Sequence, residues 1–179
     1  MESSGRTPWR GSPVSAADRY DPGPAIEALA DAGVDFVLVG GLAGIAHGSA
    51  YPTYALDIMY SRDRDNLLRL AKLLKDLGAT LRGAPPDLPF LLDADTLEEG
   101  GSFTFETQYG ALDILAHPEG APRYEDVKEA ADEIDFGGRR VLVASLDHLI
   151  AMKDTADRPK DRLMATEYRT LADEQRRQS

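Results

Sequence analysis

The chain has 179 residues, a length that suits one domain with one substantial hydrophobic core. Hydrophobic residues make up 42% and charged residues 28% of it, which is the composition of an ordinary globular protein. The absence of cysteine excludes disulfides, thiolate-ligated metals and cysteine nucleophiles. The chain also lacks the apolar run of roughly 18 residues that a membrane span needs. We therefore expect a cytoplasmic protein.

The charge is unevenly distributed along the chain. The net charge of −11 argues against a protein that binds nucleic acid over its whole surface. Residues 139–179, however, hold 9 Lys or Arg against 7 Asp or Glu. Any contact with a polyanion is therefore expected to involve the C-terminal segment.

The pattern of apolar residues and turn residues predicts a mixed α and β order. Residues 1–22 lack a hydrophobic period and are rich in Gly, Pro and Ser, which predicts a flexible tail before a single domain at residues 23–179. Helices are predicted at residues 25–32, 42–48, 65–77, 124–131, 146–153 and 163–175. Strands are predicted at residues 34–39, 55–60, 80–82, 102–107, 111–115, 133–136 and 139–143. Asp65 is expected to cap the third helix and Gly78 to follow its end.

Two adjacent glycines, Gly40 and Gly41, follow the first predicted strand. They would let backbone N–H groups approach a phosphate, and the helix that follows would add a favourable dipole. A tight strand-to-helix turn without a ligand is the alternative, and the glycines alone do not distinguish the two.

One carboxylate lies inside each of two short apolar strands, Asp57 in ALDIMY and Asp113 in ALDIL. Strand alternation places Asp57 on the face opposite Leu56 and Ile58. If the two strands are neighbours, both carboxylates share a face, and such a pair favours a hard cation. Two exposed strand faces are the alternative interpretation.

Lys153 lies on the apolar side of the predicted helix after Ser145, in line with Leu146, Leu149 and Ile150. A lysine directed into a cleft beside carboxylates would neutralise triphosphate charge. The side chain could equally extend along the apolar surface to reach water. Helical spacing leaves both interpretations open.

The segment VLVGGLAGIAHGSAYPTYALDIMY resembles the motif of the polymerase-β-like nucleotidyltransferases, which is an apolar strand, Gly-Gly or Gly-Ser, a spacer, and Asp-x-Asp in a second strand. Here 13 residues separate Gly41 from position 55. Thr53 precedes the carboxylate strand, as in the AbiEii and MenT-type toxin branch. The similarity continues through RGAPPDLPFLLDADTL, FTFETQYGALDIL and VASLDHLIAMK…RPKD, and it spans about residues 33–165.

This resemblance implies an α+β nucleotidyltransferase fold with a mixed central sheet flanked by helices. In that family, two carboxylates on one strand and a third on a later strand hold two Mg²⁺ ions. The metals bind a nucleoside triphosphate, activate the acceptor hydroxyl and stabilise the leaving pyrophosphate. Carried onto this chain, the metal ligands are Asp57 and Asp113, Lys153 has a catalytic and nucleotide-binding role, and the other nucleotide-binding residues are Gly40, Gly41 and Thr53.

The chain departs from the motif at the first metal-bridging position, where Ala55 stands in place of the expected Asp. The chain is then either a natural non-catalytic relative or an active parent whose aspartate was replaced to allow production of a harmful enzyme. Because the other motif residues are retained, we favour replacement and expect a catalytically impaired chain.

The resemblance favours transfer of a nucleotide to RNA, at the 3′ end of tRNA, by a toxin with a cognate antitoxin. Six basic residues are candidates for RNA phosphate contacts: Arg139, Arg140, Lys153, Arg158, Lys160 and Arg162. The alternatives are transfer to a protein or to a small molecule such as an aminoglycoside, and a non-catalytic nucleotide-binding antitoxin or module. A broad cleft with a basic rim would favour RNA, whereas an enclosed acidic pocket would favour a cationic small molecule.

Overall fold

The structure, a computed structural model, describes residues 20–179. The helices of this range are α1 (Gly23–Asp31), α2 (Gly40–Ala46), α3 (Arg64–Asp76), α4 (Ala94–Glu99), α5 (Tyr124–Glu129), α6 (Leu146–Ala156) and α7 (Pro159–Gln178). The strands are β1 (Phe36–Val39), β2 (Ala55–Tyr60), β3 (Thr80–Leu81), β4 (Ser102–Thr107), β5 (Gly110–Leu115), β6 (Asp132–Phe136) and β7 (Arg139–Val143). The predicted tail falls mostly on residues 1–19, which lie outside the described range.

The strands form one mixed sheet in the order β3-β4-β5-β2-β1-β7-β6. At its centre, β2 runs antiparallel to β1 and parallel to β5. Strands β4 and β5 and strands β6 and β7 form antiparallel hairpins, and the short edge strand β3 pairs antiparallel with β4. The sheet is therefore mixed, as the order of predicted elements indicates, and its central strand β2 and the neighbouring β5 carry Asp57 and Asp113.

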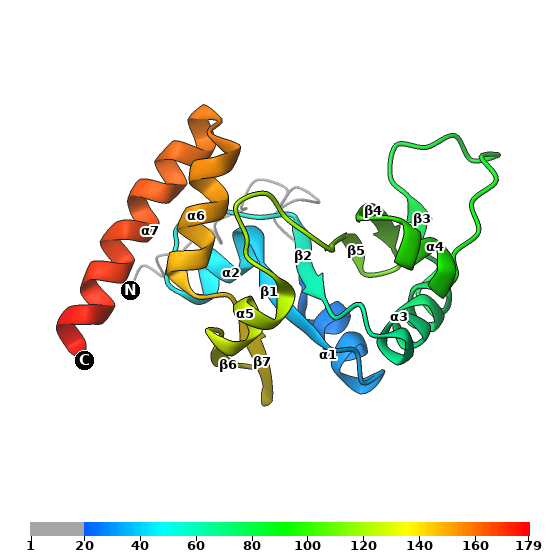
Figure 1. Ribbon diagram of the computed structural model, residues 1–179, viewed down its shortest axis with the longest axis horizontal. Helices are drawn as coiled ribbons and strands as arrows, with labels where there is room; N and C mark the ends of the chain where they lie inside the picture. Colours follow the sequence, from blue (N-terminus) through cyan, green and yellow to red (C-terminus); the bar gives the residue numbers. More distant parts are fainter. Residues whose placement is uncertain (1–19) are drawn as a thin grey trace, which may run out of the picture.

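Helices lie at both ends of the molecule. In Figure 1, α6 and α7 lie side by side at one end, where α6 contacts α2, and α3 and α4 lie close to β3 and β4 at the other. The centre of β1 and β2 is fully covered, because Leu38, Leu56 and Ile58 expose no surface. This buried centre holds the strands that carry the carboxylates in a fixed register.

Helix α3 was predicted correctly from its apolar stripe, but its N-cap residue was not. The predicted stripe is buried, with Leu67, Leu70 and Leu74 fully covered. The helix begins at Arg64 with Asp63 as the residue before it, so the prediction of Asp65 as the cap was wrong. Asp65 lies within the first turn, where a negative charge complements the helix dipole.

Several helices differ from the sequence expectation. Helix α2 begins at Gly40, two residues earlier than predicted, so it includes both glycines. Helix α4 was not predicted, and its start is stabilised by Asp93, whose side chain accepts a hydrogen bond of 2.8 Å from Thr96 N. Helix α7 begins at Pro159, several residues earlier than predicted, because Pro is favoured in the first turn. No helix among residues 20–179 is long and apolar enough to cross a membrane.

Candidate active site

Asp57 and Asp113 lie directly opposite each other on neighbouring parallel strands. The register of β2 and β5 pairs Ala55 with Ala111 and Asp57 with Asp113. Burial and the adjacent Asp113 carboxylate raise the pKa of Asp57 to about 7. The prediction that the two carboxylates share one face of the sheet is therefore confirmed, and their role in binding a metal stays a prediction.

The glycines after β1 form the wall next to Asp57. Val39, the last residue of β1, is the register partner of Asp57, so Gly40 lies against that carboxylate. Gly40 has a φ of 66°, and a Cβ atom there would overlap Asp57 Oδ2. A Cβ atom on Gly41 would lie 2.9 Å from Thr53 Oγ1. Both positions therefore need glycine for close packing, whatever ligand the turn holds.

Position 55 lies where the family motif has a third metal-binding carboxylate, but its alanine side chain has no oxygen atom. Ala55 begins β2 on the same face as Asp57, two residues away along the strand. Thr53 Oγ1 donates a hydrogen bond of 3.2 Å to Ala55 O, which holds the start of the strand. Among residues 20–179, no group of three or more His, Asp or Glu side chains is arranged to hold a metal ion.

A cluster of ionic side chains around the buried Asp161 connects α6 with α7 beside the carboxylate pair. Lys153 Nζ donates a hydrogen bond of 2.9 Å to Asp161 Oδ1, and Arg158 Nε donates one of 2.6 Å to Oδ2. Only 3% of the Asp161 side chain is exposed, against 18% for Lys153. Although burial opposes ionisation, the hydrogen bonds from Arg158 and Lys153 lower the pKa of Asp161 to about 2.

Two further side chains approach the carboxylate pair. Arg82, just beyond β3, forms an ion pair with Asp113. The ring of Tyr20 lies over the start of β5, where a Cβ atom on Gly110 would be 3.2 Å from it. Burial and then the charges of Asp57 and Asp113 raise the pKa of Tyr20 to about 12. The carboxylate pair is thus flanked by the Arg82 cation and by the neutral hydroxyl-bearing ring of Tyr20.

Two pockets meet at Asp57 and Lys153. The first, of about 510 Å³, is lined by Gly41, Pro52, Thr53, Tyr54, Ala55, Asp57, Arg82, Lys153, Arg158, Lys160, Asp161 and Met164. We call it the basic cleft, because four of its side chains are Lys or Arg and two are Asp. The second, of about 210 Å³, lies between the sheet, α6 and the segment after β5, and we call it the apolar slot.

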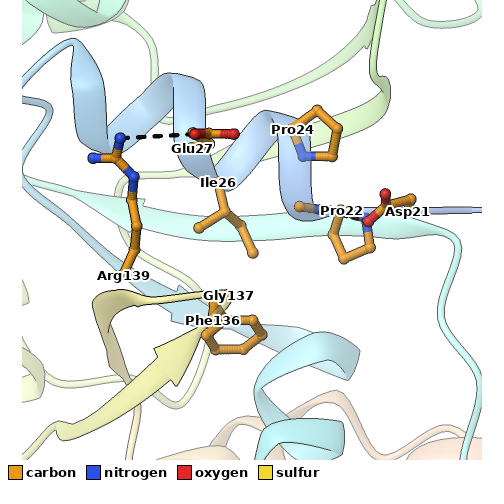
Figure 2. Close-up of a pocket in the computed structure, with 9 residues that line it drawn as sticks. Asp21, Pro22, Pro24, Ile26, Glu27, Phe136, Gly137 and Arg139 are labelled. Carbon is orange, nitrogen blue, oxygen red and sulfur yellow. Dashed lines mark hydrogen bonds and ion pairs between the residues drawn. The ribbon is translucent and has the colours of Figure 1, made fainter.

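The basic residues named from the sequence divide between this cleft and other surfaces. Lys153, Arg158 and Lys160 line the basic cleft. Arg139 instead lines a separate pocket of about 490 Å³ between α1 and the β6–β7 turn, shown in Figure 2. There Arg139 forms ion pairs with Glu27 and Asp31, which compensate its charge. Arg140 and Arg162 also form ion pairs, with Glu133 and Asp157.

Sequence reasoning missed Arg82 and Asp161 as parts of the site. Asp161 shares its helical stripe with the buried residues Met164, Ala165 and Tyr168, so an acidic residue on an apolar face was a readable signal. Arg82 had no such signal, because only the β3–β4–β5 pairing brings it to Asp113.

Comparison with known proteins shows similarity at the level of three-dimensional structure. No family model matches the chain, and no curated protein matches it by sequence. The lincosamide antibiotic adenylyltransferase LnuA, in a lincomycin-bound crystal structure, aligns with a TM-score of 0.56 at 15% identity and covers 83% of this chain and 94% of its own.

Two other solved structures align similarly. TM1012 of Thermotoga maritima, a candidate nucleotidyltransferase, gives a TM-score of 0.50 at 12% identity over 82% of this chain and 91% of its own. An antigenic nucleotidyltransferase-like protein of Paracoccidioides brasiliensis gives 0.51 at 14% identity over 83% and 72%. At these identities the comparison supports the fold alone, and the predicted nucleotidyltransferase fold is confirmed.

Proposed function

We propose that the protein is a nucleotidyltransferase of the toxin-like branch that binds a nucleoside triphosphate at Asp57, Asp113 and Lys153, and that Ala55 impairs transfer in this chain. The observation that carries the proposal is the register of Asp57 with Asp113 beside the glycine turn. Two carboxylates on rigid strands next to a lysine-lined cleft match the requirements for binding a polyphosphate and its metal.

The carboxylates present suit one Mg²⁺ ion better than two. Mg²⁺ is commonly bound by one or two carboxylates together with substrate phosphate oxygens and water. Asp57 and Asp113 are the residues that would hold it, and the ion would supply charge stabilisation at the phosphates. Ala55 has no oxygen to offer a second ion, which accounts for the expected impairment.

The charge of the cleft favours a polyanionic acceptor, and we propose the 3′ end of an RNA such as tRNA. Arg82, Arg158 and Lys160 join Lys153 around an open cleft, so the net charge of its side chains is positive. Tyr54 at the same cleft is 53% exposed and offers a ring on which an unpaired base can stack. An enclosed acidic pocket, which a cationic aminoglycoside would need, is not what these residues form.

The toxin assignment, and with it a cognate antitoxin, rests on Thr53, which precedes the carboxylate strand as in the AbiEii and MenT-type branch. The segment from Lys153 to Asp161 adds a resemblance to small stand-alone or toxin-like nucleotidyltransferases. Transfer to a protein or a small molecule is the second candidate, favoured by the acidic total charge of −11. These candidates differ in acceptor and share the same nucleotide site.

The test is to replace Ala55 with Asp and to measure incorporation of labelled nucleotide into total tRNA, total protein and aminoglycosides, with and without Mg²⁺. We expect Mg²⁺-dependent labelling of tRNA to rise about a hundredfold or more over the chain as written, the scale of losing one preorganised group at an active site. Ala55→Asn is the matched control, because it has the same shape without the charge.

The outcomes separate the candidates. Labelling of protein or aminoglycoside in place of tRNA selects the second candidate. If Ala55→Asp folds, binds Mg²⁺ and labels none of the three acceptors, the enzyme proposal fails and a non-catalytic nucleotide-binding module replaces it.

A further inference from the structure

The apolar slot is a separate compartment attached to the carboxylate centre. Its volume of about 210 Å³ is below the ~300 Å³ at which pockets for whole ligands begin, so it suits one part of a larger ligand. It shares Asp57 and Lys153 with the basic cleft. A molecule with its phosphates at these two residues can therefore extend a second group into the slot.

The slot's walls suit a flat, uncharged ring. Leu115 of β5, Leu149 and Met152 of α6, and Pro118 of the connecting segment present carbon and sulfur atoms to the cavity. Apart from Asp57 and Lys153, the one charged side chain among its described lining residues is Glu119. In a nucleoside triphosphate, the group with this character is the nucleobase.

The segment that carries Glu119 is packed firmly against α6. Gly120 has a φ of 79°, and a Cβ atom there would overlap Ala151 O and Thr155 Oγ1 of α6. Ala121 N donates a hydrogen bond of 3.1 Å to Pro118 O, which closes the turn around Glu119. The position of the Glu119 backbone is thus set before any ligand arrives.

Glu119 itself is free to bind a ligand. It is exposed, and within residues 20–179 it has no hydrogen-bond or ion-pair partner. An ionised carboxylate only accepts hydrogen bonds, and its two oxygens match two parallel N–H donors. A base with adjacent N–H donors on one edge is therefore favoured, and a base with carbonyl oxygens there is repelled.

We propose that the apolar slot holds the nucleobase of the donor nucleotide and that Glu119 makes guanine the preferred base. Guanine offers its N1–H and its exocyclic amino group side by side to the carboxylate. Adenine and cytosine offer one amino group next to a ring acceptor, and uracil places its single N–H between two carbonyl oxygens. This inference rests on the proposed function, because it assumes that a triphosphate binds at Asp57 and Lys153.

The experiment measures equilibrium binding of GTP, ATP, CTP and UTP to the full chain in Ca²⁺, which supports binding with little turnover. We expect GTP to bind about tenfold more tightly than UTP, the scale of one additional charge-assisted hydrogen bond. In Glu119→Gln an N–H₂ group replaces one oxygen, so the GTP preference should fall by about tenfold. Glu174→Gln, an exposed substitution on α7 away from both pockets, should leave it unchanged.

Each other outcome refutes a specific step. If all four nucleotides bind equally, or if Glu119→Gln keeps the GTP preference, the assignment of the slot to a base read by Glu119 is overturned while the proposed function stands. If none of the four binds the folded chain, the proposed function fails and this inference fails with it.

Discussion

Two aspartates that line the basic cleft, the partly buried Asp57 and the buried Asp161, have opposite electrostatic surroundings. Asp161 on α7 accepts hydrogen bonds from Lys153 and Arg158, and its pKa is lowered to about 2. Asp57 on β2 faces a second carboxylate, and burial with Asp113 raises its pKa to about 7. The side chains of the protein neutralise the first aspartate but only partly neutralise the second.

The difference separates a structural carboxylate from one suited to binding a ligand. Asp161 already has its cations, so it stabilises the junction of α6 and α7 and directs Lys153 towards the cleft. The Asp57–Asp113 pair has Arg82 as its direct ion-pair partner and retains an excess of negative charge. An added cation, together with the phosphates it carries, would remove that excess.

The largest effect on stability is expected from removing the charge of Asp161, which is neutralised by Lys153 and Arg158. Asp161→Asn should lower the free energy of unfolding by about 3 kcal/mol, because it leaves Lys153 partly buried with a neutral partner. The melting temperature at pH 7 should fall by roughly 6–12 °C, as measured by circular dichroism.

Asp157→Asn is the matched control for that variant. Asp157 also forms an ion pair, with Arg162, but its side chain is 66% exposed and its φ of 48° suits asparagine. A change below about 1 kcal/mol is expected there. Equal losses in the two variants would show that burial of Asp161 does not distinguish the two ion pairs.

Asp57 should make the stability of the fold depend on pH in the sense opposite to an aspartate whose pKa is lowered, such as Asp161. The pKa of Asp57 in the folded state is about 7, above the unfolded value of 3.8. Between these values the folded chain holds a proton that the unfolded chain has released, so stability falls as pH rises through 7. From pH 5 to pH 8 we expect a loss of about 2 kcal/mol in metal-free buffer, measured by denaturant unfolding.

Asp57→Asn should remove that slope and make the metal-free protein more stable at pH 8. Added Mg²⁺ should stabilise the unsubstituted chain at pH 8 and much less at pH 5.5, where a proton occupies Asp57. A pH slope that persists in Asp57→Asn would assign the titration to another group.

The carboxylate pair of Asp57 and Asp113 could be predicted only in part from the sequence. Asp57 and Asp113 each interrupt a short apolar strand, and period-2 alternation predicted a shared face on the condition that the two strands are neighbours. Their exact pairing depends on β2 and β5 being parallel neighbours although α3, β3, α4 and β4 lie between them in the chain, which no local pattern encodes. The sequence therefore indicated the residues, and the register came from tertiary structure.

The ion pairs around the site were less predictable, because each depends on how separate elements of the chain pack together. Lys153 was placed on the apolar side of its helix, but its bond to Asp161 depends on the sharp turn at Asp157 between α6 and α7. The contact of Arg82 with Asp113 likewise requires two antiparallel pairings in succession. Side-chain partners of this kind follow from topology and not from residue period.

The smallest predicted change concerns Lys153, which belongs to both regions. Lys153→Met keeps the length of the side chain and removes its charge, so the affinity for nucleoside triphosphate in Ca²⁺ should fall about tenfold. Asp161 should stay ionised, because Arg158 still donates to it. The pKa of Asp57 should rise further, since Lys153 helps to lower it, and the stability midpoint should move to higher pH.

Lys72→Met tests whether this effect is local, because Lys72 is an exposed lysine on α3 paired with Asp76 and lines neither pocket. It should change neither nucleotide affinity nor the pH midpoint. If Lys153→Met binds triphosphate as tightly as the unsubstituted chain, then the role of Lys153 is limited to its ion pair with Asp161. A shift of the midpoint without a loss of affinity would place its charge near Asp57 but outside the path of the phosphates. We expect the affinity for triphosphate to fall and the pH midpoint to shift together, because Lys153 would contact both a bound triphosphate and Asp161.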